Sequence, residues 1–432
     1  MSCFHPSAED KSHEAAFSVD FSGITFGPGV LAEAGDVLRA LSCRRVAFFT
    51  DQTVGRLEAV AVARTALQKA GVDFAVYEDV HVEPTDASFQ SAAEFARNGK
   101  FDGFLSIGGG SVIDTCKAAA LYSTYPAPFL SYVNAPIGEG RPVPGRLPVH
   151  VACPSTCGTG SECTGIAVFD HLGLRAKTAI ASRELRPTRA LIDPTLTHSL
   201  PQMVVAASGF DVLCHALESY TARPYTVRAR PPSPLARPMS QGRNPWSDLG
   251  SLEALGLGGK YLVRAVRDAS DVEARKGLMW AATLAGLAFG NAGVHLPHAM
   301  AYAVAGLVKD FRMPGYPEDE PLVPHGISVV ASAPSALAFT ASARPERHLE
   351  AAALLGADVR SASPDDAGAI LARALERTMK DARVPIGLRA LGYAEGDVGA
   401  LVAGTIVQKR LLDNAPRAVT EDDVARVFGG AL

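Results

Sequence analysis

The sequence predicts an α/β domain followed by an all-α domain. Between residues 46 and 192, short β-rich runs alternate with helical stretches, as they do in a parallel sheet with crossover helices. After Pro194 the β signal fades, and Ala- and Leu-rich segments with helical spacing take over. A length of 432 residues and a hydrophobic share of 47% suffice for two cores. We therefore expect an α/β domain over residues 1–196 and a helical domain over residues 197–432.

The elements follow in order along the chain. The expected strands are the runs VAFFT, FAVYEDV, FLSIGGG, VHVAC and ALIDP. Helical spacing then covers residues 203–220 and 248–266. Residues 223–245 interrupt the helices, are rich in proline and arginine, and have no apolar periodicity. Such a composition is typical of a surface loop or lid.

Charge and cysteine usage exclude several classes of protein. The net charge of −4 is spread along the chain without a basic run, which makes nucleic acid and membrane surfaces poor partners. Seven cysteines without regular spacing indicate reduced thiols rather than a disulfide framework. The first 17 residues mix acids, bases and histidines and resemble neither a signal peptide nor a transit peptide. We therefore expect a cytoplasmic protein.

One apolar stretch has the length of a membrane span. No Asp, Glu, Lys or Arg occurs between Lys276 and Lys309. Asn291 and His298 lie inside this stretch, and such groups are costly in lipid. Two core helices that meet at a break within residues 293–297 fit the sequence better than a span.

Three consecutive glycines connect an expected strand to an expected helix. Gly108, Gly109 and Gly110 precede Ser111, where the helix opens. Bare backbone N–H groups at the positive end of a helix suit a phosphate, although a tight turn without a ligand has the same sequence. The spacing is not the GxGxxG of the ordinary dinucleotide fingerprint.

A second loop, PSTCGTGSE, follows the strand VHVAC and combines glycines with hydroxyl donors that could hold a second phosphate and a ribose. Asp51 ends the strand VAFFT, where a carboxylate can bind an adenosine ribose and repel a 2′-phosphate, which favours NAD over NADP. Asp also starts helices for structural reasons. The expected cofactor contacts are Asp51, Gly108, Gly109, Gly110, Ser111, Asp114, Thr156, Thr159, Ser161 and Lys177.

The segment GFDVLCHALE places Asp211 and His215 at i and i+4, on one face of a helix. A lone pair of this kind is more often a surface hydrogen bond than a metal site. His298 and His325, however, both lie in apolar helical settings farther along. One aspartate and three histidines form a ligand set suited to Fe²⁺ or Zn²⁺. We expect His295 to line the pocket rather than bind the metal.

Five motifs together resemble the iron-containing (group III) alcohol dehydrogenase family: GGGSVID, GTGSE, GFDVLCHALESY, NAGVHLPHAMAY and VPHG. They follow the family's order over nearly the whole chain. Residues 82–86, 135–138 and 345–350 and the Pro-rich insert are similar to the hydroxyacid-oxoacid transhydrogenase branch of that family. The resemblance implies a dehydroquinate synthase-like fold, with the cofactor and metal in the cleft between the two domains.

The resemblance also implies residue roles. It assigns the metal to Asp211, His215, His298 and His325. Many members have a histidine where this chain has Tyr302, so the proton relay passes either to Tyr302 or to His295. The implied reaction converts 4-hydroxybutyrate and 2-oxoglutarate to succinate semialdehyde and 2-hydroxyglutarate, with NAD staying bound. Arg228, Arg237 and Arg243 of the insert are candidates for binding the substrate carboxylates.

Three alternatives remain open. The first is a conventional NAD-dependent dehydrogenase of an alcohol or of 4-hydroxybutyrate, with the same fold and metal. The second is a dehydroquinate synthase-like lyase, which would need a Lys- and Arg-rich phosphate pocket that the helical half lacks around the ligands. The third is an inactive metal-binding scaffold, against which the intact loops and ligands argue. The helical half could form a homodimer face, which no motif tests.

Overall fold

The structure is a computed structural model that describes residues 12–174 and 176–432. The described chain falls into two compact units. We call Phe21–Leu200 the sheet unit, and residues 12–20 together with Pro201–Leu432 the helical unit. Residues 1–11 lie outside the described chain, so the prediction about the N-terminal segment rests in part on residues that the structure does not describe.

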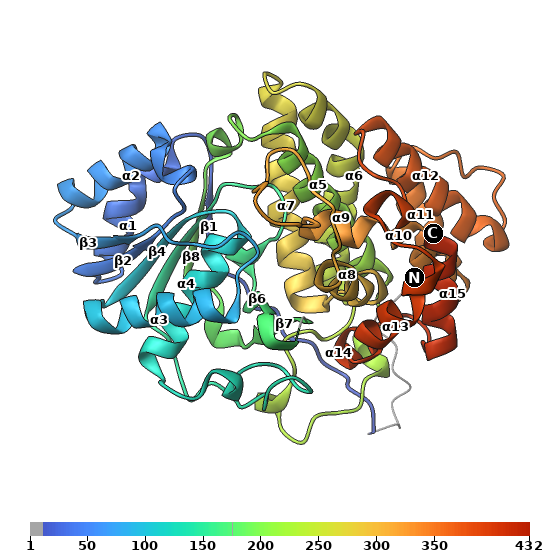
Figure 1. The fold of residues 1–432 in the computed structure, drawn as a ribbon, viewed down its shortest axis with the longest axis horizontal. Coiled ribbons are helices and arrows are strands. Elements are labelled where there is room, and N and C mark those ends of the chain that lie inside the picture. The colour runs from blue at the N-terminus through green and yellow to red at the C-terminus, as the bar shows by residue number, and fades with distance from the viewer. Residues whose placement is uncertain (1–11, 175) are drawn as a thin grey trace. The chain divides into compact units, whose positions relative to one another are not determined.

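The sheet unit is built on six parallel strands in the order β1-β8-β5-β4-β2-β3 (Figure 1). The strands are β1 (Gly23–Phe26), β2 (Arg45–Phe49), β3 (Asp73–Tyr77), β4 (Gly103–Gly108), β5 (Val149–Pro154) and β8 (Arg189–Ile192). The helices are α1 (Ala34–Ala40), α2 (Glu58–Lys69), α3 (Asp86–Gly99) and α4 (Gly110–Thr124). An antiparallel hairpin of β6 (Ile166–His171) and β7 (Ala176–Ala181) accompanies the sheet. This is the α/β architecture that the alternating runs predict.

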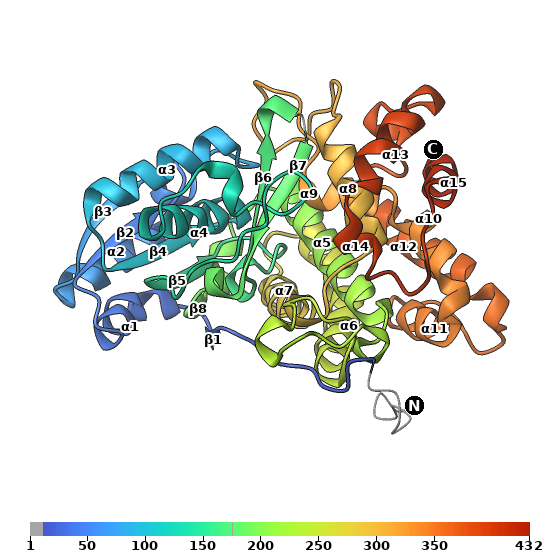
Figure 2. The same ribbon diagram turned by 90° about the horizontal axis from the view of Figure 1, so that it is seen from below.

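Residue alternation along the strands divides the core of the sheet unit between two faces. Val46 and Phe48 of β2 pack in one cluster with α1 and α2. Ala47 and Phe49 of the same strand pack in another cluster with α3 and α4. Helices therefore cover both faces of the sheet, as Figures 1 and 2 show. Such burial explains why the strands are continuous apolar runs in the sequence.

The helical unit confirms the all-α expectation for the second half of the chain. Its longest helices are α5 (Gln202–Thr221), α6 (Pro245–Arg267) and α7 (Val272–Ala292). The others are α8 (Leu296–Gly306), α9 (His325–Val330), α10 (Ala333–Thr340), α11 (Pro345–Leu354), α12 (Ala367–Asp381), α13 (Val398–Ile406), α14 (Lys409–Leu412) and α15 (Glu421–Ala431). Helices α5 and α6 approach closely at Gly209, because glycine has no side chain. A β-carbon there would lie 2.2 Å from Leu262 Cδ1.

The long apolar stretch forms two helices that bend sharply. Helices α7 and α8 meet at 104°, with the break inside the expected residues 293–297. Gly293 ends α7 with a φ of +84°, a conformation that glycine adopts without strain. Within the described residues no single helix is long and apolar enough to cross a membrane, and this bent pair passes by length and composition only.

Residues 12–20 run along the insert of residues 223–245. The backbone N–H of Glu14 donates to the carbonyl of Arg228 at 2.8 Å. Its carboxylate accepts from Arg237 Nε at 2.9 Å. These contacts explain why residues 12–20 belong to the helical unit, whereas the sequence had placed them in the α/β domain. The domain bounds of the sequence analysis otherwise stay a prediction.

Candidate functional site

One face of helix α5 carries three ionisable side chains. Asp211, His215 and Glu218 follow one another at i, i+4 and i+7, the spacing that aligns side chains along a helix. All three residues are buried. A cluster of two acids and an imidazole in a core must find partners, because burying an unpaired charge is costly. The partners come from α8 and α9.

Two further imidazoles reach Asp211 from the first turns of α8 and α9. The start of α9 packs directly on α5: a β-carbon at Gly326 would lie 1.9 Å from the carbonyl oxygen of Ala207. Only glycine permits that approach, and it brings the preceding His325 to the site. His298 lies in the first turn of α8, which carries a proline at its N-terminus.

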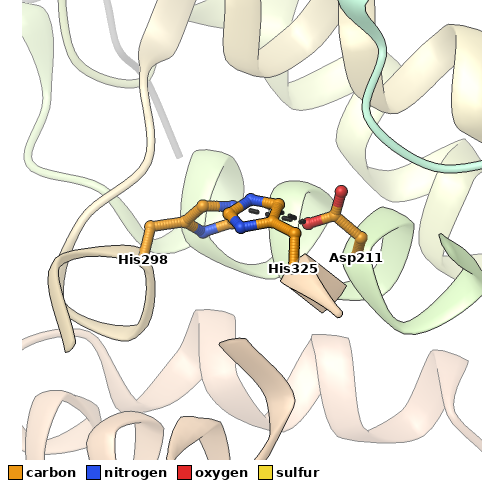
Figure 3. A group of neighbouring side chains, drawn as sticks. All are labelled: Asp211, His298 and His325. Atoms are coloured by element: carbon orange, nitrogen blue, oxygen red, sulfur yellow. Dashed lines mark ion pairs between the residues drawn. The ribbon is translucent and has the colours of Figure 1, made fainter. Parts of the chain in front are cut away.

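The three histidines of the predicted ligand set converge on one carboxylate oxygen of the fourth member, Asp211, as Figure 3 shows for His298 and His325. Asp211 Oδ1 lies 3.6 Å from His215 Nε2, 3.5 Å from His298 Nε2 and 3.8 Å from His325 Nε2. Ligand atoms of Asp211, His298 and His325 all lie within 4.8 Å of one another, a group that could hold a metal ion. His215 is not a member of that group, and its ring stacks on Phe289 at 3.9 Å.

The bonding of these atoms fits a divalent metal ion. Asp211 Oδ1 and His298 Nε2 are buried and make no hydrogen bond with any described residue. Buried polar atoms without a partner are rare in native proteins, so atoms of this kind that face one another point to a ligand. Carboxylate oxygen and imidazole nitrogen are donors that Fe²⁺ and Zn²⁺ both accept.

Glu218 orients His298 by bonding to the ring nitrogen that faces away from Asp211. Its Oε1 lies 2.5 Å from His298 Nδ1, and its Oε2 accepts the backbone N–H groups of His295 at 2.7 Å and His298 at 3.3 Å. A bond from Nδ1–H to the carboxylate leaves the lone pair on Nε2, the atom that faces Asp211. The sequence analysis gave Glu218 no role, although its spacing from Asp211 and His215 was visible.

The charges of the cluster depend on one another. Burial alone would raise the pKa of Asp211, but His215, His325 and His298 hold it well below its usual range. Burial lowers the pKa of His298, but Glu218 and Asp211 outweigh burial and raise it to about 9. Burial lowers the pKa of His215 to about 3. An ionised carboxylate beside a neutral His215 suits a cation, which must displace the proton of His298.

The two candidates for the proton relay differ in their surroundings. The ring of Tyr302 lies 6.5 Å from that of His325, one of the predicted ligands. His295 is fully buried, and its Nε2 lies 2.9 Å from Thr221 Oγ1. Burial lowers the pKa of His295 to about 4. The relay role of either residue stays a prediction.

In the sheet unit, the two glycine loops pack against each other. We call residues 108–110 the triple-glycine loop and residues 154–162 the hydroxyl loop. β-carbons at Gly109 and Gly110 would lie 3.4 Å from Thr156 Cγ2 and 2.6 Å from Thr159 Cγ2. The glycines therefore make room for the hydroxyl loop as well as leaving backbone N–H groups bare at the start of α4.

Two more of the predicted cofactor residues also take part in the local structure. Asp51 Oδ1 accepts the N–H groups of Thr53 and Val54, each at 2.8 Å. Ser111 Oγ accepts the backbone N–H of Glu83 at 3.2 Å. These bonds place both residues at the carboxyl edge of the sheet, where ligands of such folds bind. Their contact with a cofactor stays a prediction.

The remaining polar residues of the predicted cofactor set bond within two networks, each centred on a buried lysine. Lys177 Nζ donates to Glu83 Oε2 at 2.8 Å and to Asp170 Oδ2 at 2.9 Å. Burial opposes the charge of Lys177, but these two carboxylates outweigh it and raise its pKa. Asp114 and Ser161 bond to each other and to Lys117. Sequence spacing gave no sign of Glu83 and Ser161 as partners, because they lie far from Lys177 and Lys117 in the chain.

The three insert arginines pair with carboxylates of the chain itself. Arg237 Nε and Arg228 Nη2 lie 2.9 Å and 3.7 Å from Glu14 Oε2. Arg243 Nη1 lies 3.8 Å from Asp248 Oδ2. Their proposed contact with a substrate carboxylate would have to compete with these pairs.

Comparison with known proteins decides the family. The model of the iron-containing alcohol dehydrogenases matches residues 22–194, and that of the C-terminal domain of the Fe-containing alcohol dehydrogenase family matches residues 239–432. The mitochondrial hydroxyacid-oxoacid transhydrogenase of Mus musculus is 49% identical over 429 residues, which are 99% of this chain and 92% of the relative. The chain belongs to the iron-containing alcohol dehydrogenase family. It is therefore an oxidoreductase that acts on CH–OH groups.

Solved structures of iron-containing alcohol dehydrogenases and their relatives share this fold. The alcohol dehydrogenase from Oenococcus oeni has a TM-score of 0.84 and 26% identity, and the match covers 96% of this chain and 100% of that one. Sulfoacetaldehyde reductase from Bifidobacterium kashiwanohense, solved with NAD⁺, has a TM-score of 0.77 at 24% identity, with 97% and 99% covered. Family membership supports a metal ion and NAD as cofactors.

One prediction from the sequence is contradicted by the comparisons. The mouse relative, similar over 99% of this chain, is named as a mitochondrial protein. The inference of a cytoplasmic location is therefore wrong. It rested on the mixed composition of the first 17 residues, and composition alone does not report where a protein is delivered.

Proposed function

We propose that the chain is a metal- and NAD-dependent hydroxyacid-oxoacid transhydrogenase. The observation that carries the proposal is the cluster of Asp211 with the buried His215 and His298 and the partly exposed His325, in which Glu218 bonds to His298. It is supported by 49% identity, over nearly the full length of both chains, to a relative of that name. The proposed substrates are 4-hydroxybutyrate and 2-oxoglutarate.

The proposed metal ligands are Asp211, His215, His298 and His325, with Fe²⁺ or Zn²⁺ as the ion. Support comes from the unsatisfied atoms Asp211 Oδ1 and His298 Nε2, which need a partner in the core. When bound, the ion would act as a Lewis acid toward the oxygen of the substrate. Asp211 would supply the negative charge of the site, and Glu218 would keep the Nε2 lone pair of His298 turned toward it.

The proposed proton path begins at Tyr302. Its ring is near that of His325, and its hydroxyl is a donor and an acceptor that could pass the substrate's proton toward water. His295 is less suited to this role, because its Nε2 already bonds to Thr221 Oγ1 in the core. We therefore assign the relay to Tyr302 and a positioning role to His295.

The overall reaction is balanced in two halves. Oxidation of 4-hydroxybutyrate to succinate semialdehyde would release a hydride and a proton, and Tyr302 would take the proton. Reduction of 2-oxoglutarate to 2-hydroxyglutarate would consume one hydride and one proton, and bound NAD would supply the hydride acceptor and donor for the two halves. The triple-glycine loop and the hydroxyl loop are the proposed site for the pyrophosphate, supported by the bare N–H groups at the start of α4.

A deuterium-transfer assay tests the proposal. The Fe²⁺-loaded enzyme is given 4-hydroxybutyrate deuterated at the hydroxyl-bearing carbon, 2-oxoglutarate and unlabelled free NADH. We expect deuterium in 2-hydroxyglutarate that the free NADH does not dilute. Label diluted by free NADH, with steady NADH release when 2-oxoglutarate is absent, would instead identify a conventional dehydrogenase. Failure to form either product would reject the substrate class, and His298→Ala serves as the metal-free control.

A further inference from the structure

A lysine is completely buried in helix α4. Lys117 stands in a run of buried residues, and none of its side chain is exposed. Lysine is almost never fully buried unless it is paired, because removing an ammonium from water is costly. Neither the metal chemistry nor the proposed relay uses this residue.

The three N–H groups of Lys117 have three acceptors. Nζ lies 3.2 Å from Asp114 Oδ1, 2.5 Å from Ser161 Oγ and 2.7 Å from the carbonyl oxygen of Ile166. An ammonium has three donors, so this one is fully satisfied. Burial lowers the pKa of Lys117, and Asp114 opposes that shift.

The network ties three segments of the sheet unit together. Ser161 Oγ also donates to Asp114 Oδ1, and Asp114 Oδ2 accepts the N–H of Val168 at 2.9 Å. Asp114 and Lys117 belong to α4, Ser161 begins the short 3₁₀ helix Ser161–Cys163, and Val168 belongs to β6. Satisfied buried networks of this kind fix one arrangement of the groups that they join.

The hydroxyl loop is held at both ends by such contacts. Near its start, the N–H of Ser155 donates to the carbonyl of Gly108 at 2.9 Å. Near its end, Ser161 bonds to Lys117. Between these points Gly160 has a φ of +59°, a conformation that favours glycine. The position of Lys117 therefore determines how the loop lies against the triple-glycine loop.

We propose that Lys117, together with Asp114 and Ser161, is a positioning group that holds the hydroxyl loop in its dinucleotide-binding shape and thereby sets how slowly NAD leaves. This inference rests on the proposed function, in which NAD must stay bound through both half-reactions. A loop that is ordered before binding loses less conformational freedom when the ligand binds, so the ligand is held more tightly. In place of the direct contact with the cofactor that the sequence analysis expected, Asp114 and Ser161, which bond to each other, then act through the loop.

Two variants and one matched control test the network. Ser161→Ala removes one acceptor of Lys117 and leaves the pair with Asp114 in place. The double variant Asp114→Asn with Lys117→Met removes both charges together, so neither is left buried alone. The control is Ser123→Ala, also on α4, whose hydroxyl donates to the carbonyl of Ala120 in its own helix at 3.3 Å.

The main measurement is the rate at which NAD leaves the holoenzyme, followed by stopped flow with an NAD trap. We expect both variants to release NAD at least about tenfold faster, the effect of losing about 1.4 kcal/mol of binding. The KM for NAD should rise while kcat at saturating NAD and the metal content stay near the wild-type values. Ser123→Ala should match the wild type throughout.

Two outcomes would overturn the proposal. One is wild-type NAD release from folded, metal-loaded Ser161→Ala and from the double variant. The other is a loss of kcat that saturating NAD does not restore, because that would indicate general damage to the fold. If the wild type retains NAD but forms no 2-hydroxyglutarate, the proposed function fails, and faster release from the variants still supports the role of Lys117.

Discussion

At the scale of single residues, Glu218 determines which nitrogen of His298 faces the predicted metal. One of its carboxylate oxygens bonds to His298 Nδ1, and the other accepts the backbone N–H groups of His295 and His298 at the start of α8. A glutamine has one acceptor oxygen, so either one of these bonds is lost or its amide N–H donates to Nδ1, which moves the ring proton to Nε2, the nitrogen that faces the predicted metal. For Glu218→Gln we expect metal affinity to fall by about 10- to 100-fold, the usual cost of losing such a partner. Competition with a chelator, read by metal analysis, measures the change.

Two comparisons calibrate that experiment. His298→Ala removes a proposed ligand and should lose more metal than Glu218→Gln. Glu253→Gln makes the same chemical change at an exposed position of α6 and should retain wild-type affinity. Wild-type affinity in Glu218→Gln would show that the bond to His298 does not orient a ligand.

How far sequence predicts these residues depends on where their partners lie. Asp211 and His215 are neighbours on one helix, so their spacing alone indicates a shared face. His298 and His325 were added from their apolar settings and from the family resemblance. The bond between Glu218 and His298 depends on how α8 docks against α5, which no local pattern encodes. The same holds for Lys117 and Ser161, which come from different elements.

At the scale of elements, Gly326 permits the contact of α9 with α5. A β-carbon there would lie 1.9 Å from the carbonyl oxygen of Ala207 and 3.0 Å from Asp211 Cβ. For Gly326→Ala we expect α9 to move away from α5 and to take His325 with it. Stability should fall by about 1–3 kcal/mol, the usual cost of overpacking, and metal content should fall too. Urea unfolding and metal analysis of the purified variant measure both effects.

The control for this prediction is Gly399→Ala in α13. A β-carbon at Gly399 meets no atom within 4 Å, so alanine should stabilise the helix by up to about 1 kcal/mol. Full metal retention in Gly326→Ala would mean that the close approach of α9 does not position His325.

The elements that the sequence predicted share a strong local signal. The five predicted strands are present as β2, β3, β4, β5 and β8, because each contains a run of apolar residues, which burial explains in all but the half-buried edge strand β3. Strand β1 was missed: it has only four residues and pairs at the edge of the sheet with β8, far along the chain. The hairpin β6–β7 was missed as well. Strand β7 is mostly buried, but its sequence AKTAIA is rich in alanine and contains a lysine, so it forms no apolar run.

At the scale of the whole molecule, each unit contains a histidine that burial keeps neutral. In the sheet unit, His150 bonds to Ser106 Oγ at 2.8 Å, and burial lowers its pKa to about 3. In the helical unit, His348 lies 3.1 Å from Thr340 Oγ1, and burial lowers its pKa to about 4. Both rings have an ordinary pKa of 6.5 once the chain unfolds. As the pH falls below that value, these rings become protonated in the unfolded chain but stay neutral in the folded chain. The free energy of unfolding therefore decreases.

We therefore expect both units to lose stability between pH 6.5 and about 4, by about 2 kcal/mol for each ring at pH 5, since one pKa unit corresponds to about 1.36 kcal/mol. Urea unfolding from pH 7.5 to pH 5 measures the decrease, and His150→Gln should remove its share from the sheet unit while leaving that of His348. The exposed His13→Gln is the matched control and should leave the profile unchanged. A profile of His150→Gln that parallels the wild type would show that this ring does not couple folding to pH. If His150→Gln removes only the contribution of His150, the two units lose stability in acid independently of each other. Mild acid would then destabilise the unit with the proposed metal cluster through His348 and the unit with the proposed cofactor loops through His150.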